Sequence, residues 1–404
     1  MTQSLADELR AAATPPPPKG WKPEVIYAGQ VPKTITTGLV DGPRAETQEQ
    51  YQAIVASLGV PIPVGYTLQL AEAALNTVAW QREPQDRGSK DSAFTGPAWR
   101  YRFKVVPSGI LEDDLDLKAL FAEAKRAKAP AGMAQPSTMT TMVINLGDFQ
   151  VGKVDSRGGL VELLARNAQA KAAVIKQIRK IKPVEVVLVD GGDAMEGFES
   201  SPNADRTNDL QQTEQMRVWR RLFWGWVHDV SRLVEDVKVV GVPSNHCRVR
   251  RGKAAVGSVN DDYGLEVVSQ LADMAEVNPE AYGHVTFHVP PEHDEHLALT
   301  LASGKVWGAA HGHQKGSPQG LLGWLEGQAA GRSPIGHADY VSLFHFHNLY
   351  VQTWGDDRWA FGCPTMDSGS SWFRNISGKE SRAGVLTFVI DENGWRDLFV
   401  AWTD

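Results

Sequence analysis

Residues 141–153, "TMVINLGDFQVGK", join an apolar run to a Gly-Asp turn. The run predicts a buried strand, with Asp148 directly after it and Gln150 two positions further on. Open α/β sheets place their binding sites at the carboxyl ends of strands, which favours a functional role for this carboxylate. An acid at such a position is also typical of a helix N-cap, so this stretch alone leaves both interpretations open.

Strands and helices alternate after this stretch. The sequence predicts, in order, a helix over 160–182, a strand over 184–193, a helix over 208–236 and a strand over 237–245. Strands that alternate with helices form right-handed crossovers, so we expect a largely parallel sheet. Beyond residue 284 the sequence predicts further strands without intervening helices, and "DENG" at 391–394 turns the last hairpin.

The chain is long enough for two domains. Consecutive prolines break any helix near the start, and residues before 125 mix turns with one helix and an aromatic strand. We therefore expect a small accessory α+β domain, followed by linker composition and then the α/β domain. The expected segments are a flexible stretch over 1–19, the accessory domain over 20–125, the linker over 126–138 and the main domain over 139–404.

The composition is that of an ordinary globular protein, with 42% apolar and 22% charged residues. A formal net charge of −7 argues against a surface coated in basic residues, although it permits a local basic groove. The sequence has no apolar run of the roughly 18 residues that a membrane helix needs, and its start does not resemble a signal peptide. Cys247 and Cys363 form neither a disulfide framework nor a CxxC pair. We expect a cytoplasmic protein.

Polar residues that can bind metal recur where apolar runs end. Each alone has another explanation, as a cap, a turn residue or a hydrogen-bonded core histidine, but their repetition in sequence favours one shared site. Carboxylate, amide and imidazole groups together suit ions such as Mn²⁺, Fe²⁺, Zn²⁺ or Ni²⁺. The residues are Asp148, Gln150, Asp193, Asn245, His246, His311, His345 and His347.

The order D-x-Q, GGD, NH, H and H-x-H over about residues 140–375 resembles the calcineurin-like metallophosphoesterase superfamily, including members encoded by bacteriophages and actinobacteria. The resemblance implies an α/β/β/α sandwich of two mixed sheets and two divalent metal ions, with Mn²⁺ favoured and Fe, Zn, Ni or Mg as alternatives. Asp193 would bridge the ions, and His246 would face the scissile phosphate without binding metal. The remaining ligands would be Asp148, Gln150 and His347 for the first ion, and Asn245, His311 and His345 for the second.

Three positions depart from the family pattern. The usual D-x-H is D-x-Q here, so Gln150 offers an amide oxygen in place of an imidazole. Cys247 replaces the carboxylate that usually follows the catalytic histidine, which removes a common orienting partner. Phe344 stands where the terminal G-H-x-H has its glycine. We expect Glu196 to support the ligands without binding metal, and "HGH" offers His313 as an alternative to His311.

A basic run follows the Asn-His pair directly. It reads "RVRRGK" and contains Arg248, Arg250, Arg251 and Lys253. In an acidic chain, such a run beside a phosphoesterase site favours a polyanionic substrate such as nucleic acid, although an ordinary solvated loop is the alternative. The aromatic strand "AWRYRFKVV" at 98–106 suits base stacking or simple half-burial.

We therefore expect a dimetal phosphodiesterase that acts on nucleic acid, as a nuclease in DNA processing. The first alternative is a phosphatase for a small-molecule or protein phosphomonoester, with the same metals. The second is a degenerate scaffold of a DNA replication or repair complex, without turnover. A serine-hydrolase elbow and a P-loop are both absent from the sequence, which argues against those classes. The sequence indicates no membrane partner and identifies no protein partner.

Overall fold

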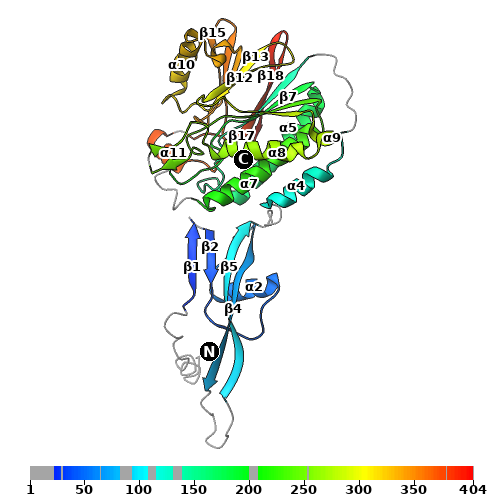
Figure 1. The fold of residues 1–404 in the computed structure, drawn as a ribbon. Coiled ribbons are helices and arrows are strands. Elements are labelled where there is room, and N and C mark those ends of the chain that lie inside the picture. Colours follow the sequence, from blue (N-terminus) through cyan, green and yellow to red (C-terminus); the bar gives the residue numbers. More distant parts are fainter. Residues whose placement is uncertain are drawn as a thin grey trace, which may run out of the picture. The chain divides into compact units, whose positions relative to one another are not determined.

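The computed structural model describes residues 22–28, 31–63, 65–81, 93–107, 115–130, 139–199, 208–252, 254–378 and 380–403. The chain divides into two compact units, Met1–Ser108 and Gly109–Asp404 (Figure 1). The predicted flexible segment at 1–19 lies outside the described residues, as does most of the predicted linker. Among the described residues, no helix has both the length and the apolarity that crossing a membrane requires.

Within its described residues, the N-terminal unit is an antiparallel sheet with one helix. Its strands are β1 (Glu24–Ala28), β2 (Val31–Thr36), β3 (Val40–Asp41), β4 (Tyr66–Gln81) and β5 (Ala93–Pro107), in the order β1-β2-β5-β3 with β4 also paired to β5. Helix α2 (Gln48–Ser57) begins at Thr47 with a capping box to Gln50. Tyr51 of this helix packs on Phe103 of the sheet, with ring centroids 5.1 Å apart. These contacts form the unit's own core.

The larger unit contains a six-stranded mixed sheet. Its order is β11 (Val285–His288), β8 (Asp236–Gly241), β7 (Glu185–Asp190), β6 (Thr141–Leu146), β17 (Gly384–Asp391) and β18 (Gly394–Trp402). The first four strands are parallel, whereas β17 and β18 run antiparallel to their neighbours. Leu146 is paired in register with Asp190, and Asp190 with Gly241. Three strands therefore end together, and the loops that follow them start at one edge of the sheet.

A second, five-stranded mixed sheet completes the frame. Its order is β12 (His296–Thr300), β13 (Val306–Ala310), β14 (Tyr340–Leu343), β16 (Arg358–Gly362) and β15 (Tyr350–Gly355). Strands β13 and β14 are parallel, with Ala310 opposite Leu343. The loops beginning at His311 and Phe344 therefore also leave from neighbouring positions.

Apolar side chains of the two sheets meet in one buried cluster. Val187 of β7 and Trp307 of β13 belong to it, and Phe388 of β17 stacks on Phe361 of β16 with ring centroids 4.1 Å apart. Each fully buried aromatic or aliphatic side chain contributes roughly 1.5–3 kcal/mol. This cluster fixes the second sheet against the first and so fixes the loops of both.

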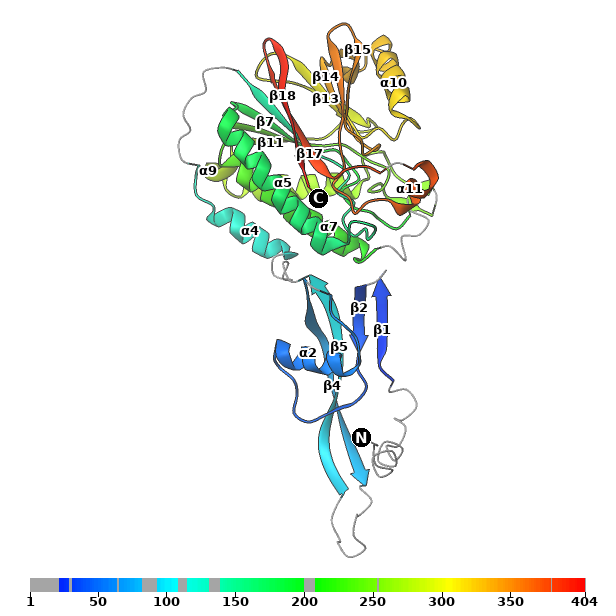
Figure 2. The same ribbon diagram turned by 180° about the vertical axis from the view of Figure 1, so that it is seen from behind.

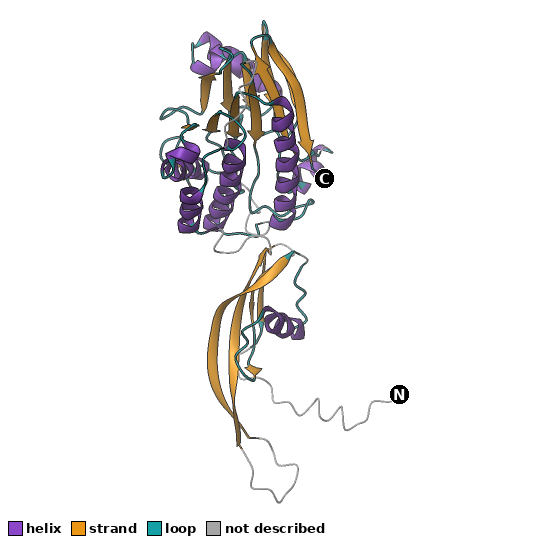
Figure 3. Ribbon diagram, turned by 90° about the vertical axis from the view of Figure 1, so that its right-hand side faces the viewer, coloured by secondary structure: helices purple, strands orange, loops and turns teal. Residues whose placement is uncertain are grey.

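Helices cover the outer faces of the two sheets (Figures 2 and 3). Helices α5 (Leu160–Ile181), α7 (Gln212–Ser231) and α8 (Tyr263–Glu276) pack in the core of the first sheet, and α10 (Pro318–Ala330) packs against the second. The amide of Gly159 binds Glu162 at the start of α5, and Lys182 ends that helix with φ at 53°. Shorter elements are α4 (Leu117–Arg126), α9 (Pro279–Tyr282), α11 (Ser371–Ser377), η1 (Pro334–His337), β9 (Arg250–Arg251) and β10 (Ala254–Ala255).

The expected mixed α/β class is confirmed, and two details differ from expectation. Most of helix α4 falls within 20–125, the expected bounds of the accessory domain, but the helix belongs to the larger unit, where Leu120 and Ala124 join its core. The expectation that no helix follows residue 284 is wrong, because α10 connects β13 to β14. Three glycines weaken its helical pattern, although Ser317 and Pro318 mark its start as a cap and first helical residue.

Candidate metal centre

The candidate ligands lie in loops that follow β6, β7, β8, β13 and β14. The amide of Asp148 donates to the main-chain oxygen of Gly192 at 3.0 Å, and the amide of Gln150 donates to that of Asp193 at 2.9 Å. Left-handed backbone is uncommon outside glycine and collects at functional sites, where surrounding structure holds it. Five candidate ligands adopt it, with φ at 52° for Asp148, 44° for Gln150, 48° for Asp193, 69° for His345 and 58° for His347.

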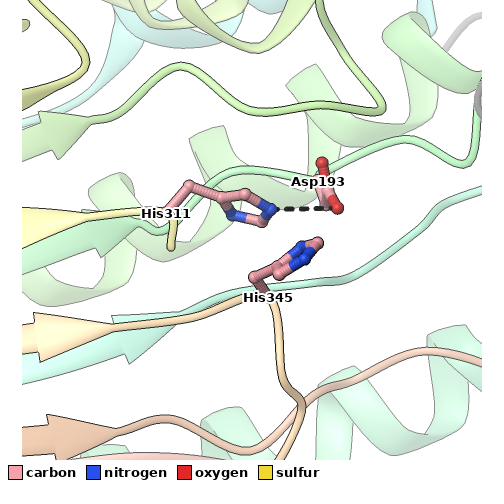
Figure 4. A group of neighbouring side chains, drawn as sticks. All are labelled: Asp193, His311 and His345. Atoms are coloured by element: carbon pink, nitrogen blue, oxygen red, sulfur yellow. Dashed lines mark ion pairs between the residues drawn. The ribbon is translucent and has the colours of Figure 1, made fainter. Parts of the chain in front are cut away.

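Asp193, His311 and His345 form the most compact group of possible ligands. One ligand atom from each lies within 4.8 Å of the other two. Figure 4 shows the three side chains together, with the ion pair between Asp193 and His311 as a dashed line. Nε2 of His311 lies 3.1 Å from Oδ2 of Asp193 and 3.1 Å from Oδ1 of Asn245. Nδ1 of His311 faces the main-chain oxygen of Gly191 at 2.8 Å, which fixes the ring and leaves Nε2 for a metal. The structure thus brings together the four residues expected around the second ion.

Asp148 and His347 meet on the other side of the centre. Nε2 of His347 lies 3.1 Å from Oδ1 of Asp148, and the amide of His345 donates to Oδ2 of Asp148 at 3.2 Å. Gln150 is only 4% exposed, but its side-chain oxygen accepts a hydrogen bond from Nζ of Lys153 at 2.6 Å. The side-chain oxygen of Gln150 therefore already has a cationic partner within the chain, Lys153.

His246 is oriented by its main chain and by Glu196. Its amide donates to Oδ1 of Asp193 at 2.8 Å, and its Nε2 lies 3.9 Å from Oδ2 of the same residue. Nδ1 faces the main-chain oxygen of Glu196 at 2.7 Å, and the Glu196 carboxylate is 3.5 Å away. The carboxylate of Glu196 therefore lies where it can orient the His246 ring. Cys247, at the position usual for that carboxylate, is buried and accepts from the amide of Met195.

Burial and mutual contact set the charges of the compact group. Burial opposes ionisation of Asp193, but the nearby His311 and His246 outweigh it and hold the pKa of Asp193 well below its usual range. Burial likewise opposes the charged form of His311, yet Asp193 raises the pKa of His311 to about 9. Burial and the neighbouring His311 lower the pKa of His345 to about 4. His345 is therefore neutral at physiological pH, the form that binds metal.

Phe344 explains how the site does without the usual glycine. A Cβ at Gly147 would lie 2.2 Å from the Phe344 ring, and one at Gly191 would also lie 2.2 Å from it. The ring therefore fills space that these two glycines leave open. It locks the loop that carries His345 against the loops that carry Asp148 and Asp193.

Asp367 belongs to the site and was missed by the sequence analysis. Its side chain is 1% exposed and pairs with Lys153 at 2.7 Å, Arg157 at 3.3 Å and Nδ1 of His347 at 3.6 Å. Thr365, in the same loop, donates its hydroxyl proton to the main-chain oxygen of Asp148 at 2.8 Å. An acid after the apolar run "RWAFGCPTMD" at 358–367 was the available signal, because this loop follows β16.

Two further candidates occupy distinct places near the centre. His313 pairs with Glu295 at 3.6 Å, whereas His311 is fully buried and faces Asp193, so the geometry favours His311 as the ligand. Burial raises the pKa of Glu196 despite the nearby His246 and Lys153.

The predicted basic run consists of Arg248, Arg250, Arg251 and Lys253, of which Lys253 lies outside the described residues. Arg248 pairs with Glu295 at 3.7 Å, and Arg250 donates to the main-chain oxygen of Asn245 at 3.3 Å. Arg251 is exposed in the hairpin formed by β9 and β10. The run therefore borders the candidate centre, with one described arginine facing solvent.

The donor set fits a divalent ion. Buried carboxylate, amide and imidazole atoms approach one another, as ligands of a hard to borderline metal do. Oδ1 of Asp148 is buried and makes no hydrogen bond, although Nε2 of His347 is 3.1 Å away. The larger unit therefore contains a candidate metal site around Asp193, His311 and His345.

No family model and no curated protein sequence matches this chain. Among solved structures, Vps29 of Chaetomium thermophilum is similar at a TM-score of 0.29 and 11% identity, covering 66% of this chain and 97% of that one. GAP50 of Plasmodium, described as the anchor in the inner membrane complex, is similar at a TM-score of 0.29 and 12% identity, covering 65% of this chain and 85% of that one. A 5'-nucleotidase from Candida albicans is similar at a TM-score of 0.28 and 6% identity, covering 66% of this chain and 54% of that one. TM-scores this low establish neither a shared fold nor a shared function.

Replacing Asp193 by asparagine should release most of the bound metal. The change keeps the shape of the side chain but removes the charge that faces His311 and His246. Elemental analysis of the gel-filtered protein measures the effect. Asp229→Asn is the control, because Asp229 is 42% exposed and pairs with Lys171. Full metal retention in Asp193→Asn would contradict the assignment.

Replacing Gly191 by alanine should destabilise the larger unit by about 1–3 kcal/mol, as overpacking of a core does. The new Cβ would lie 2.2 Å from the buried Phe344 ring. Chemical denaturation measures the change. Gly323→Ala is the matched control, since nothing lies within 4 Å of its added Cβ and alanine favours helix α10 by up to about 1 kcal/mol. Equal stability of Gly191→Ala and the wild type would refute the packing role of Phe344.

Proposed function

We propose that this chain is a divalent-metal-dependent phosphoesterase that hydrolyses phosphodiester bonds in nucleic acid. The observation that carries the proposal is the meeting of Asp193, His311 and His345 within 4.8 Å, beside an oriented His246. Ligands that arrive from the ends of separate strands make a site for chemistry, because a structural ion is usually closed by ligands from one local motif. Mn²⁺ is the proposed ion, since the set mixes carboxylate and amide oxygens with imidazoles.

Asp193, Asn245, His311 and His345 would hold the metal, beside Asp148, Gln150 and His347. When bound, a divalent ion supplies Lewis acidity, which lowers the pKa of water and withdraws charge from phosphoryl oxygens. His246 keeps its Nε2 available, because Nδ1 is turned to the Glu196 main chain. A histidine held in this way can place a proton on the leaving oxygen or bind developing negative charge.

The basic run supports a polyanionic substrate. Arg250 joins the run to the main chain of Asn245, and Arg251 projects from the hairpin that follows. Cations beside a phosphoesterase centre can hold the backbone of a nucleic acid while one phosphate reaches the reacting atoms. We therefore favour a nuclease in DNA processing over a phosphatase for small or protein monoesters.

Replacing His246 by alanine should lower turnover by about 100-fold or more, while metal content stays at the wild-type level. The contact of residue 246 with Oδ1 of Asp193 is made by its main-chain amide, which alanine retains. Initial rates with Mn²⁺ and elemental analysis test both parts. His293→Ala should leave both unchanged, because His293 is exposed and paired with Glu292. Metal loss in His246→Ala would make His246 a ligand and the proposed role wrong.

Neutralising Arg248, Arg250, Arg251 and Lys253 with glutamine should weaken binding of any single-stranded DNA about equally. The slope of log affinity against log salt should become shallower by up to about 0.7 for each phosphate that the protein no longer neutralises. Hydrolysis of a small chromogenic phosphodiester should change little, because that substrate needs only the centre. A variant with the same charge change on the exposed residues Lys176, Arg179, Lys180 and Arg217 is the control.

The same assays separate the alternatives. Unchanged DNA binding and cleavage by the neutralised run at elevated salt would exclude it as the substrate path and favour a phosphatase for monoesters. Release of phosphate from monoesters, with no cleavage of DNA or of the chromogenic diester, would establish that second activity. Bound metal without turnover on any substrate would indicate a scaffold.

A further inference from the structure

A buried ammonium group lies on the Gln150 side of the centre. Nζ of Lys153 donates to Oε1 of Gln150 at 2.6 Å and to Oδ2 of Asp367 at 2.7 Å. The Lys153 side chain is 12% exposed and that of Asp367 is 1% exposed. Nδ1 of His347 is 3.6 Å from the same Asp367 oxygen. The ammonium therefore lies among residues that the family resemblance assigns to the first ion.

The backbone fixes this lysine in place. The amide of Lys153 donates to the main-chain oxygen of Gln150 at 3.0 Å, which closes a turn directly after the ligand loop. Gly152 has φ at 101°, and a Cβ there would lie 2.6 Å from Gln215. A turn so constrained holds the lysine close to Gln150.

Lys153 also stays charged. Its Nζ lies 2.7 Å from Oδ2 of the buried Asp367 carboxylate, and an opposite charge at that distance favours the charged form of both groups. Arg157 adds a second cation at 3.3 Å from Asp367. The chain thus supplies its own positive charge to this carboxylate.

The other side of the centre is built differently. The side chains of Asp193 and His311 face imidazole and amide groups, with Nε2 of His311 3.1 Å from both Asp193 and Asn245. His345 completes a group whose ligand atoms lie within 4.8 Å of one another. Such groups coordinate a divalent ion, whereas an ammonium repels it.

We propose that this chain binds one divalent ion tightly, in the set of Asp193, Asn245, His311 and His345, and that Lys153 supplies the positive charge on the Gln150 side. The inference rests on the proposed metal centre and replaces the two-ion expectation drawn from the family resemblance. An ion on Gln150 would compete with Lys153 for the amide oxygen and would be repelled by its charge. A fixed ammonium is also a point charge to which a phosphate oxygen can bind.

The first test counts the ions. Protein saturated with Mn²⁺ and freed of excess by gel filtration should hold about one ion per chain by elemental analysis, with the electron paramagnetic resonance spectrum of an isolated ion. Two tightly held, exchange-coupled ions would overturn the inference and leave the proposed metal centre standing. No bound ion would instead refute the proposed metal centre itself.

Substitutions of Lys153 test whether this residue limits the number of bound ions to one per chain. Lys153→Met leaves Gln150 and Asp367 without the ammonium, so the content should rise towards two ions per chain. Lys153→Arg keeps the charge and should hold one. Lys171→Met is the control, since Lys171 is 25% exposed and pairs with Asp229. If Lys153→Met fails to fold by circular dichroism, Lys153→Gln removes the same charge with a polar side chain and should likewise bind a second ion. One ion in a folded Lys153→Met or Lys153→Gln variant would overturn the role of Lys153.

A second pair of variants locates the single ion. His311→Ala should lose it, because that imidazole faces both Asp193 and Asn245. His347→Ala should keep it, because that imidazole contacts Asp148 and Asp367 on the Lys153 side. The reverse result, loss in His347→Ala and retention in His311→Ala, would place the ion on the Gln150 side and overturn the inference.

Discussion

Leu146, Asp190 and Gly241 are register partners in three parallel strands, and the candidate site depends on that register. A shift of one residue would turn every side chain of a strand to the opposite face and would move its loop along the edge. The main-chain bonds from Asp148 to Gly192 and from Gln150 to Asp193 then carry the alignment into the loops. The second sheet adds His311 and His345 from β13 and β14, which are themselves parallel neighbours. Hydrogen bonding of the backbone therefore decides which ligands can meet.

Burying this many ionisable groups is possible only because each has a partner. A carboxylate as buried as Asp193 would favour its neutral form if it stood alone, and His311 and His246 reverse that preference. Asp367 is held ionised in the same way by Lys153 and His347, although burial opposes it. The charges are thus interdependent, and removing one leaves another unpaired in a region of low dielectric.

The sequence located the candidate ligands more readily than the residues that contact them. Asp148, Asp193 and His311 could be found because each follows an apolar run that forms a strand. The contact between Lys153 and Gln150 could not be found, since side-chain direction depends on the turn around Gly152 and on Asp367, more than 200 residues away. Asp367 itself was hidden because β16 was not recognised as a strand. Helix α10 was missed for a local reason, because its glycines lower the helical propensity that such a prediction uses.

Each of the three departures from the pattern of the family that the sequence resembles is accommodated by different neighbouring residues. The ring of Phe344 fits because Gly147 and Gly191 have no Cβ, so a glycine missing from one loop is matched by glycines in two others. Cys247 offers no carboxylate, and Glu196 approaches the same histidine from another loop. These two accommodations conserve packing or orientation and leave the charge of the centre unchanged. The third differs in kind, because Gln150 is neutral and Lys153 brings a full positive charge to it. In the proposed one-ion centre, this charge takes the place of a second cation.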